Sequence, residues 1–277
     1  MTAAASDAAS ALFDRYLERW DLLADGDPIV THSSRLLPVR RRGIPAMLKI
    51  AIEAEEKFGG LLMSWWDGEG AARVLAYDEG ALLLERAEGT RSLAAMARDR
   101  RDDETTRILC DVAARLHAPR GKPWPDLIPL EPWFGALLPM AALQGGLLAE
   151  SAALACELLD APREIGVLHG DIHHDNVLDF GARGWLAIDP KRLVGERGFD
   201  YANLFCNPDR AVATEPALFE RRIAIVVAHG GLERIRLLQW IVAWCGLSAA
   251  WFLGNDMTED AETDFAVARL ALAALAR

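Results

Sequence analysis

The sequence predicts an α+β protein of two lobes: a small N-terminal lobe built on an antiparallel sheet, and a larger, mainly helical C-terminal lobe. Short apolar runs separated by turn residues fill most of residues 1–87, which is the pattern of an antiparallel sheet. Over residues 88–277, apolar side chains mostly recur at helical spacing. The chain has 277 residues, of which 52% are hydrophobic. That is enough for two lobes, since one domain typically takes about 150 residues.

In the N-terminal lobe, strand-like segments alternate with two helical ones. Phe13, Leu17, Trp20 and Ala24 recur at helical spacing, which predicts an amphipathic helix up to about residue 24. A second helix is predicted over residues 51–66, with its acidic residues in the first half. Strands are predicted over residues 28–32, 35–40, 45–50, 72–77 and 81–86, with turns at 33–34, 41–43 and 78–80.

In the C-terminal lobe, helices surround one β hairpin. Ile108, Val112 and Leu116 mark one helix face, and residues 119–139 are predicted to be a proline-rich loop. Two short strands are predicted at 176–179 and 185–188. Residues 237–254 approach the length of a membrane span. Trp240, Trp244 and Trp251 nevertheless share one helix face there, which favours a buried helix of a bundle.

Charge and cysteine content narrow the function classes. The net charge is −11 and the pI is near 5.1, which disfavours binding to nucleic acid or to an anionic membrane and favours a cationic small-molecule ligand. No two of Cys110, Cys156, Cys206 and Cys245 are close in sequence, so they are predicted to be buried thiols in a reducing compartment. The N-terminal residues do not resemble a signal peptide, which predicts a cytoplasmic protein. The sequence carries no signature of the oligomeric state.

One segment carries most of the chemistry. Residues 168–178 read LHGDIHHDNVL, and residues 188–190 read IDP. Four residues separate Asp171 from Asn176, and Asp189 follows after a predicted hairpin, which is the order and spacing of a kinase catalytic loop and its metal-binding aspartate. Phosphoryl transfer needs a carboxylate beside the attacking hydroxyl, a role that suits Asp171. It also needs hard oxygen ligands for Mg²⁺, which Asn176 and Asp189 can supply.

The same segment allows other interpretations. His169, His173 and His174, together with Asp175, could form the metal cluster of a hydrolase. They could also be no more than a polar turn that caps a helix.

The wider context resembles the aminoglycoside phosphotransferase family of the protein-kinase-like fold, and within it the streptomycin 6-kinase and hydroxyurea-resistance kinase branch. The similarity is strongest in residues 168–178, 184–190, 193–205 and 246–251, and it is weaker in residues 66–75 and 82–87. It implies an ATP- and Mg²⁺-dependent transfer of the γ-phosphoryl group to a hydroxyl of an aminoglycoside such as streptomycin.

The resemblance also implies roles for single residues. Lys49 would hold the nucleotide phosphates and pair with Glu56, with Glu53 and Glu55 as alternatives. Backbone groups of residues 85–87, from Glu85 to Ala87, would meet the adenine. The turn at Ser33 and Ser34 would cover the nucleotide without the usual glycines. Asp200 would brace the catalytic loop by accepting backbone N–H bonds, and His169 and His173 would be structural.

The sequence offers only candidates for the residues that bind the acceptor. Acidic side chains would attract a cationic acceptor, and the candidates by position are Glu196, Asp256, Glu259 and Asp260. Trp251 could stack on a sugar ring or pack in the core. Three alternative functions stay open. The protein could be a kinase of a metabolite such as a sugar, a choline-like alcohol or homoserine, or a kinase of a hydroxyurea-type molecule. It could also be a nucleotide-binding protein without turnover.

Overall fold

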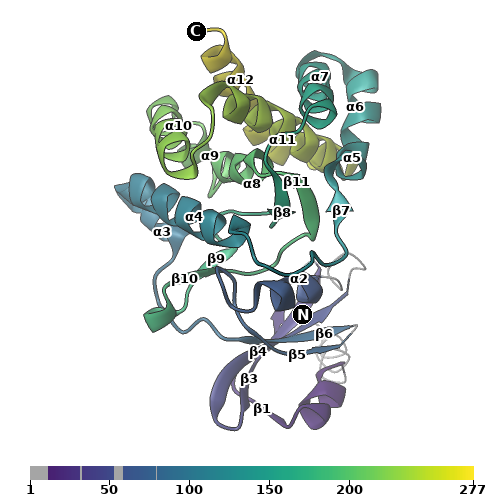
Figure 1. Cartoon of the computed structure of the whole chain (residues 1–277), viewed down its shortest axis with the longest axis vertical. Coiled ribbons are helices and arrows are strands. Elements are labelled where there is room, and N and C mark those ends of the chain that lie inside the picture. Colours follow the sequence, from purple (N-terminus) through teal and green to yellow (C-terminus); the bar gives the residue numbers. More distant parts are fainter. Residues whose placement is uncertain (1–11, 32, 53–58, 79) are drawn as a thin grey trace.

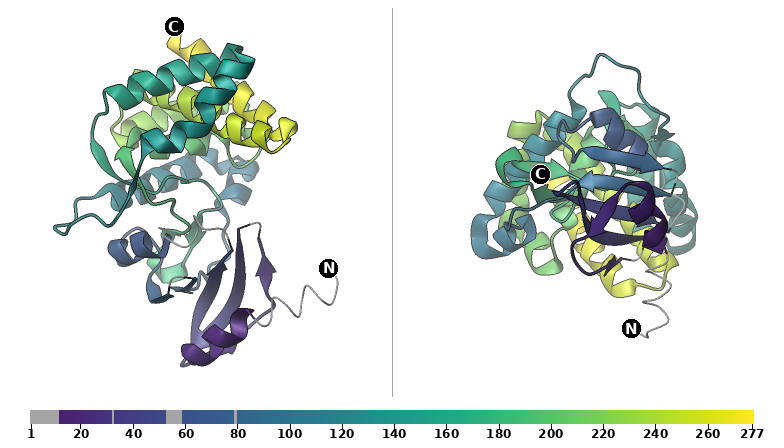
Figure 2. Two further views of the ribbon diagram at one scale, coloured as in Figure 1. Left: turned by 90° about the vertical axis from the view of Figure 1, so that its right-hand side faces the viewer. Right: turned by 90° about the horizontal axis from the view of Figure 1, so that it is seen from below.

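A computed structural model describes residues 12–31, 33–52, 59–78 and 80–277 of the chain. Figure 1 shows two lobes, with a β sheet at the N-terminal end and a stack of helices at the other. The side view in Figure 2 (left) shows the helices above the sheet, and the view from below (right) shows the sheet in front of the helices. The predicted α+β architecture of two lobes is confirmed.

The N-terminal sheet is antiparallel throughout, with strand order β1-β3-β4-β6-β5 and β2 paired to β3. Its strands match the predicted segments closely, apart from the additional β1: they are β1 (Leu22–Ala24), β2 (Ile29–Val30), β3 (Ser34–Arg41), β4 (Ile44–Ala51), β5 (Val74–Asp78) and β6 (Ala81–Glu85). Arg42 and Gly43 turn the chain between β3 and β4, both with positive φ. β4 lies between β3 and β6, so its residue Lys49 sits in the centre of the sheet.

The prediction of a helix up to residue 24 was wrong in its second half. Residues 12–19 are helical, Asp21 then takes a φ of 52°, and Leu22 begins strand β1. Leu22 pairs with Arg41 on β3. The free edge of β3 gives these residues backbone hydrogen bonds, and this tertiary pairing outweighs the local helical pattern.

Helix α2 (Gly59–Trp66) lies between the N-terminal sheet and the helical lobe (Figure 1). The predicted helix 51–66 is observed from Gly59, whereas Ala51 ends β4 and residues 53–58 lie outside the described part. Trp66 is fully buried, stacks on His169 and donates from its indole N–H to the Leu116 carbonyl (3.2 Å). Through this packing, α2 belongs to the large core of the helical lobe.

The helical lobe is organised around α11 (Arg234–Gly254), which packs against α12 (Thr258–Leu275), α7 (Gly146–Asp160) and α8 (Gly198–Ala202). The helix is long and apolar enough to cross a membrane, but 72% of its apolar window is buried inside the protein. The prediction of a buried bundle helix is therefore confirmed. The lobe also contains α3 (Leu93–Met96), a π-helical turn (Ala97–Arg101), α4 (Asp102–His117), a 3₁₀ turn η5 (Asn203–Cys206), α9 (Arg210–Ala213) and α10 (Pro216–Gly230).

The prediction of a loop over residues 119–139 was wrong. The segment contains β7 (Ile128–Pro129), α5 (Leu130–Trp133), a 3₁₀ turn (Phe134–Ala136) and the start of α6 (Leu137–Gln144). Pro132 and Pro139 each fall in the first turn of a helix. The missing proline N–H costs nothing there, because the first amides of a helix have no partner within it.

Two small β units carry the loops between the lobes. β9 (Val177–Asp179) and β10 (Trp185–Ala187) form the predicted hairpin. β8 (Ile165–Leu168) pairs with β11 (Leu193–Glu196), which was not predicted. The chain that links the lobes is tied to β9, since the Gly89 amide donates to the Asp179 carbonyl (2.9 Å) and Arg91 pairs with the Asp179 carboxylate (2.7 Å).

Candidate active site

Asp171 lies in the loop between β8 and β9, and two asparagine amides hold its carboxylate. Asn203 Nδ2 donates to Asp171 Oδ1 (2.7 Å), and Asn176 Nδ2 donates to Asp171 Oδ2 (3.1 Å) and to the Asp171 carbonyl (3.0 Å). The side chain keeps 27% of its exposure. Asp171 is thus oriented by neutral donors and still open to solvent, which is what a group that accepts a proton from a substrate needs.

Asp189 follows the β9–β10 hairpin and connects the two lobes. Its carboxylate forms an ion pair with Lys49, a residue that is only 7% exposed in the middle of the sheet. Asp189 has a φ of 63°, a strained conformation for a residue other than glycine. The Ile188 amide donates to the Asn176 carbonyl (2.9 Å), so the loops that carry Asn176 and Asp189 are hydrogen-bonded together.

His169 lies beneath these two loops. Its Nε2 atom is 2.8 Å from the Ile188 carbonyl, and its Nδ1 atom accepts from the Asp171 amide (3.2 Å). These partners require the tautomer protonated at Nε2. Burial lowers the pKa of His169, which favours the neutral ring. His169 therefore couples the segment before Asp189 to the backbone of Asp171.

Asp200 is a buried carboxylate that accepts three hydrogen bonds. Its donors are the amides of His169 (2.8 Å) and Gly170 (2.6 Å), and it is also bonded to Nε2 of His117 (2.7 Å). Gly170 has a φ of 84°, and a Cβ atom there would lie 2.7 Å from Leu193. The turn into Asp171 thus depends on a glycine backbone and a fixed anion below it.

The other residues named for the nucleotide belong to the small lobe and the start of the segment after it, and those that the structure describes are Ser33, Ser34, Glu85 and Ala87. Ser33 is in the turn between β2 and β3, and Ser34 is the first residue of β3, with a buried Oγ that has no hydrogen-bond partner within the described contacts. Glu85 ends β6. Its amide donates to the Arg73 carbonyl (3.0 Å) and its carboxylate pairs with Arg183. Ala87 is half-buried two residues later, and Glu56 lies outside the described residues, as do Glu53 and Glu55.

Sequence reasoning missed two side chains that contact Asp171. One is Asn203, only 4% exposed, and the other is Lys191, whose Nζ atom is 3.8 Å from Asp171 Oδ2. Lys191 directly follows the Ile-Asp-Pro motif in a chain that has only four lysines. That position could have identified it.

An open pocket with an acidic wall begins at Asp171. Glu259 and Asp260 line it, as predicted by position, and so do Trp251 and further acids of the helical lobe. Glu196 was a wrong candidate, because it is buried against Arg236 (2.6 Å) and Trp240 (2.8 Å). Asp256 is exposed outside the pocket wall. The ring of Trp251 packs on Trp133 and the residue lines the pocket, so its stacking on a sugar ring stays a prediction.

The three histidines do not gather as metal ligands. His169 uses both ring nitrogens for backbone contacts, and burial lowers the pKa of His174 well below its usual value. No group of three or more histidine, cysteine, aspartate or glutamate side chains is placed to hold a metal ion in the part of the chain that the structure covers. The structure gives the hydrolase alternative no support.

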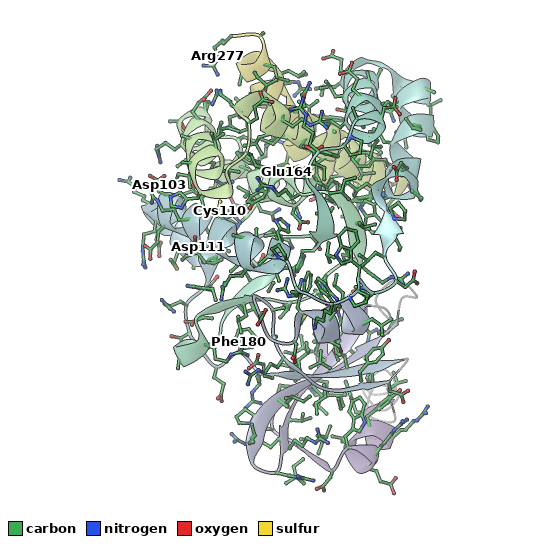
Figure 3. The ribbon with its side chains drawn as sticks, in the orientation of Figure 1. Asp103, Cys110, Asp111, Glu164, Phe180 and Arg277 are labelled. Atoms are coloured by element: carbon green, nitrogen blue, oxygen red, sulfur yellow. The ribbon has the colours of Figure 1, made fainter. Side chains whose placement is uncertain are left out.

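The prediction of buried thiols is confirmed for Cys110 and Cys245 and wrong for Cys156, which is exposed, and for Cys206, which is half-buried in the pocket wall. Cys110 on α4, labelled in Figure 3, is buried, and desolvation raises the pKa of its thiol to about 12. Such a thiol stays protonated and does not react as a nucleophile.

The two lobes, the braced Asp171 and the interlobe pair of Lys49 and Asp189 define a kinase-like small-molecule phosphotransferase. The model of one family, described as aminoglycoside/hydroxyurea antibiotic resistance kinase, matches residues 19–256. The chain belongs to this family of antibiotic resistance kinases, which confirms the predicted family.

Individual relatives agree with this assignment. A streptomycin 3''-kinase of Klebsiella pneumoniae is 58% identical over 244 residues, covering 86% of this chain and 91% of that protein. A streptomycin 6-kinase of Streptomyces griseus is 33% identical over 274 residues, covering 93% and 87%. A hydroxyurea phosphotransferase of Kitasatospora aureofaciens is 31% identical over 270 residues, covering 93% and 77%.

Solved structures share the fold at low sequence identity. A choline/ethanolamine kinase family protein from Mesorhizobium loti superposes with a TM-score of 0.68 at 17% identity, covering 96% of this chain and 94% of that one. A thermostable mutant of the aminoglycoside phosphotransferase APH(4)-Ia, in a ternary complex with ADP and hygromycin B, gives a TM-score of 0.64 at 14% identity, covering 94% of this chain and 98% of that one. The predicted protein-kinase-like fold is thereby confirmed.

Proposed function

We propose that this kinase transfers the γ-phosphoryl group of ATP to streptomycin in the cytoplasm, and that the position modified is 3''. The observation that carries the proposal is the continuity between Asp171 and an acidic pocket, because it puts a proton acceptor where a polycationic, hydroxyl-rich substrate would bind. The 58% identity to a streptomycin 3''-kinase supports this substrate and this position over the 6-position.

Asp171 is proposed to orient the acceptor hydroxyl and take its proton as the phosphoryl group is transferred. Three side chains that contact Asp171 support this role. Asn203 and Asn176 hold one carboxylate oxygen each, which restricts rotation of the group. Lys191 Nζ lies within ion-pair distance of Asp171 Oδ2, at 3.8 Å. General-base assistance of this kind is typically worth about 10²- to 10⁴-fold in rate.

Lys49, Asn176 and Asp189 are proposed to hold the nucleotide and its Mg²⁺. Mg²⁺ held there would neutralise the negative charge of the phosphates during transfer. The residues fit this ion: the Asn176 amide nitrogen is engaged with Asp171, which leaves the harder Oδ1 atom to face a cation. Asp189 offers Lys49 one oxygen and retains a second. The backbone of residues 85–87, the turn at Ser33 and Ser34, and Glu56 stay proposals for the rest of the nucleotide site.

The test is ADP release from ATP and Mg²⁺ with streptomycin, other aminoglycosides, hydroxyurea or choline as acceptor. Mass spectrometry and NMR of the product then locate the phosphate. We expect streptomycin to stimulate turnover and the phosphate to be at the 3''-position. Asp171→Asn should lower kcat at least about 10²-fold, whereas Asp175→Asn, an exposed acid of the same loop, should keep the activity.

Each other outcome has a definite meaning. Phosphate at the 6-position would overturn the regiochemistry and leave the acceptor assignment intact. Turnover with hydroxyurea or choline but not with streptomycin would replace the acceptor. ATP binding with no turnover for any acceptor would favour the nucleotide-binding alternative. Full activity of Asp171→Asn would refute the role given to Asp171.

A further inference from the structure

Asp264 is a buried carboxyl group in the wall of the acceptor pocket. It lies on α12 with 2% exposure, and the lining of the pocket runs from Asp171 to this residue. Ser248 and Cys206 lie within hydrogen-bonding reach of the carboxyl. Its Oδ2 atom nevertheless has no hydrogen-bond partner within the described contacts. A buried carboxyl oxygen without a partner is costly, and its position in a ligand pocket points to a partner supplied by the ligand.

The surroundings of Asp264 contain no described ion-pair partner. On its own helix, Asp260 is one turn away and adds negative charge. From α11 and η5 the packed groups are Ser248, Cys245 and Cys206, none of them cationic. At the far side of the pocket, Asp209 is already paired with Arg98 (2.7 Å), and Arg210 is exposed.

Burial therefore controls the charge of Asp264. Desolvation, the largest cause, raises its pKa to about 7, and Asp260 acts in the same direction. Hydrogen bonds from Ser248 and Cys206 oppose this shift of the pKa. The group is therefore divided between its neutral and ionised forms near neutral pH.

We infer that Asp264 recognises a cationic nitrogen group of the acceptor, a guanidinium or an ammonium, and releases its proton to solvent when that group binds. The inference rests on the proposed function and adds a specificity-determining residue to it. On binding, the O–H bond of the neutral carboxyl breaks and its proton passes to water. The carboxylate that remains accepts N–H hydrogen bonds from the cation. A cation in the pocket favours the ionised form, so binding and proton release are coupled.

The coupling sets the pH dependence of acceptor binding. Below pH 7 more of the protein carries the proton, so ionisation must accompany binding and the apparent affinity falls. With a folded pKa of about 7, binding at pH 6 should be about tenfold weaker than at pH 8. About half a proton should be released per streptomycin bound at pH 7, and about 0.1 at pH 8.

The test is calorimetric titration of the full-length protein with streptomycin, in the presence of ADP and Mg²⁺ and in phosphate and Tris buffers. The two buffers differ in ionisation enthalpy, so the difference in heat counts the protons released. Asp264→Asn should bind at least about tenfold more weakly at pH 8. It should release about half a proton less than the wild type at pH 7. The difference in affinity between the two proteins should narrow toward pH 6, where the wild type is mostly protonated.

Two further variants separate recognition from folding. Ser248→Ala removes a hydrogen bond that lowers the pKa of Asp264, so the midpoint of proton release should move to higher pH. Glu259→Gln removes an exposed charge of the same pocket. It should weaken binding without changing the number of protons. A thermal melt confirms that each variant is folded.

Equal affinity and equal proton release in the wild type and a folded Asp264→Asn would overturn the inference. Wild-type turnover distinguishes the two failures. If the wild type phosphorylates streptomycin and Asp264→Asn behaves like it, only the inference fails. If the wild type neither binds nor phosphorylates streptomycin, the proposed function fails, and the inference fails with it.

Discussion

Replacing Arg222 with methionine should unfold the helical lobe far more easily than replacing its neighbour Arg221. Arg222 and Asp102 are each 1% exposed and form two parallel hydrogen bonds, Nε to Oδ2 (2.9 Å) and Nη2 to Oδ1 (2.6 Å). Arg222 also donates to the carbonyls of Leu204 (2.9 Å) and Asn207 (2.8 Å). The guanidinium thus holds α4, α10 and the segment after α8 together.

The magnitude follows from what the variant leaves behind. Removing one partner of a buried ion pair costs about 3–5 kcal/mol, because the other charge stays buried. The Leu204 and half-buried Asn207 carbonyls also lose the Arg222 donor, which adds to this cost, at about 1–3 kcal/mol for a buried acceptor left without a partner. These costs overlap, because all of them arise from the loss of one guanidinium, so we expect a loss of at least about 4 kcal/mol. Arg221 pairs with Asp103 at the surface (3.0 Å), and Arg221→Met should cost less than about 1 kcal/mol.

Urea unfolding followed by tryptophan fluorescence measures both free energies of unfolding. The double variant Asp102→Leu/Arg222→Met should be more stable than Arg222→Met alone, because it leaves no charge without a partner. The folded Arg222→Met variant should also have a lower kcat, because the segment that Arg222 holds carries Asn203, which donates a hydrogen bond to Asp171. Equal losses of stability for Arg221→Met and Arg222→Met would refute the reasoning.

Three further outcomes are expected. The pKa of Asp264 is raised from about 4 in the unfolded chain to about 7 in the folded protein, so the folded state binds an extra proton between these pH values. The free energy of unfolding should therefore fall by up to about 4 kcal/mol from pH 4 to pH 8 through this group. Urea titrations at both pH values should show that Asp264→Asn lacks this loss. Gly170→Ala should cost about 1–3 kcal/mol in thermal unfolding, because φ is 84° and the new Cβ meets Leu193; an unchanged melting temperature would contradict this. Lys49→Met should raise KM for ATP and lower kcat while leaving the affinity for streptomycin unchanged, as measured by kinetics and calorimetry.

The catalytic loop could be predicted from the sequence because its chemistry is local. Asp171 and Asn176 lie five positions apart on one loop, and the hairpin that brings Asp189 back is itself short and well marked. Spacing therefore implied proximity. Asn203 and Lys191 could not be placed in the same way, since they reach Asp171 from other segments and only tertiary packing sets those contacts.

The acceptor pocket was the least predictable part for the same reason. Glu196 and Asp260 are both acids in helix-rich sequence, yet Glu196 is buried against Arg236 and Asp260 lines the pocket. Residues 22–24 show the converse: their local pattern continues a helix, and the open edge of β3 makes them a strand. In each case the deciding contact lies at least fifteen residues away in the chain.

The apolar helix α11 explains how a scaffold of this composition can form an acidic site. Most of its side chains are buried against α7, α8 and α12, and this packing makes the helix resemble a membrane span. The same helix contributes Trp244, Ser248 and Trp251 to the pocket. Because α12 packs along α11, the acids of its first two turns line the pocket beside this partly apolar wall, and Asp264 is buried there. A carboxyl group beside such a wall is poorly hydrated, so a cation that binds there replaces little solvent and interacts strongly with it. The hydrophobic core of the helical lobe is thus also what gives Asp264 its affinity for a cationic acceptor.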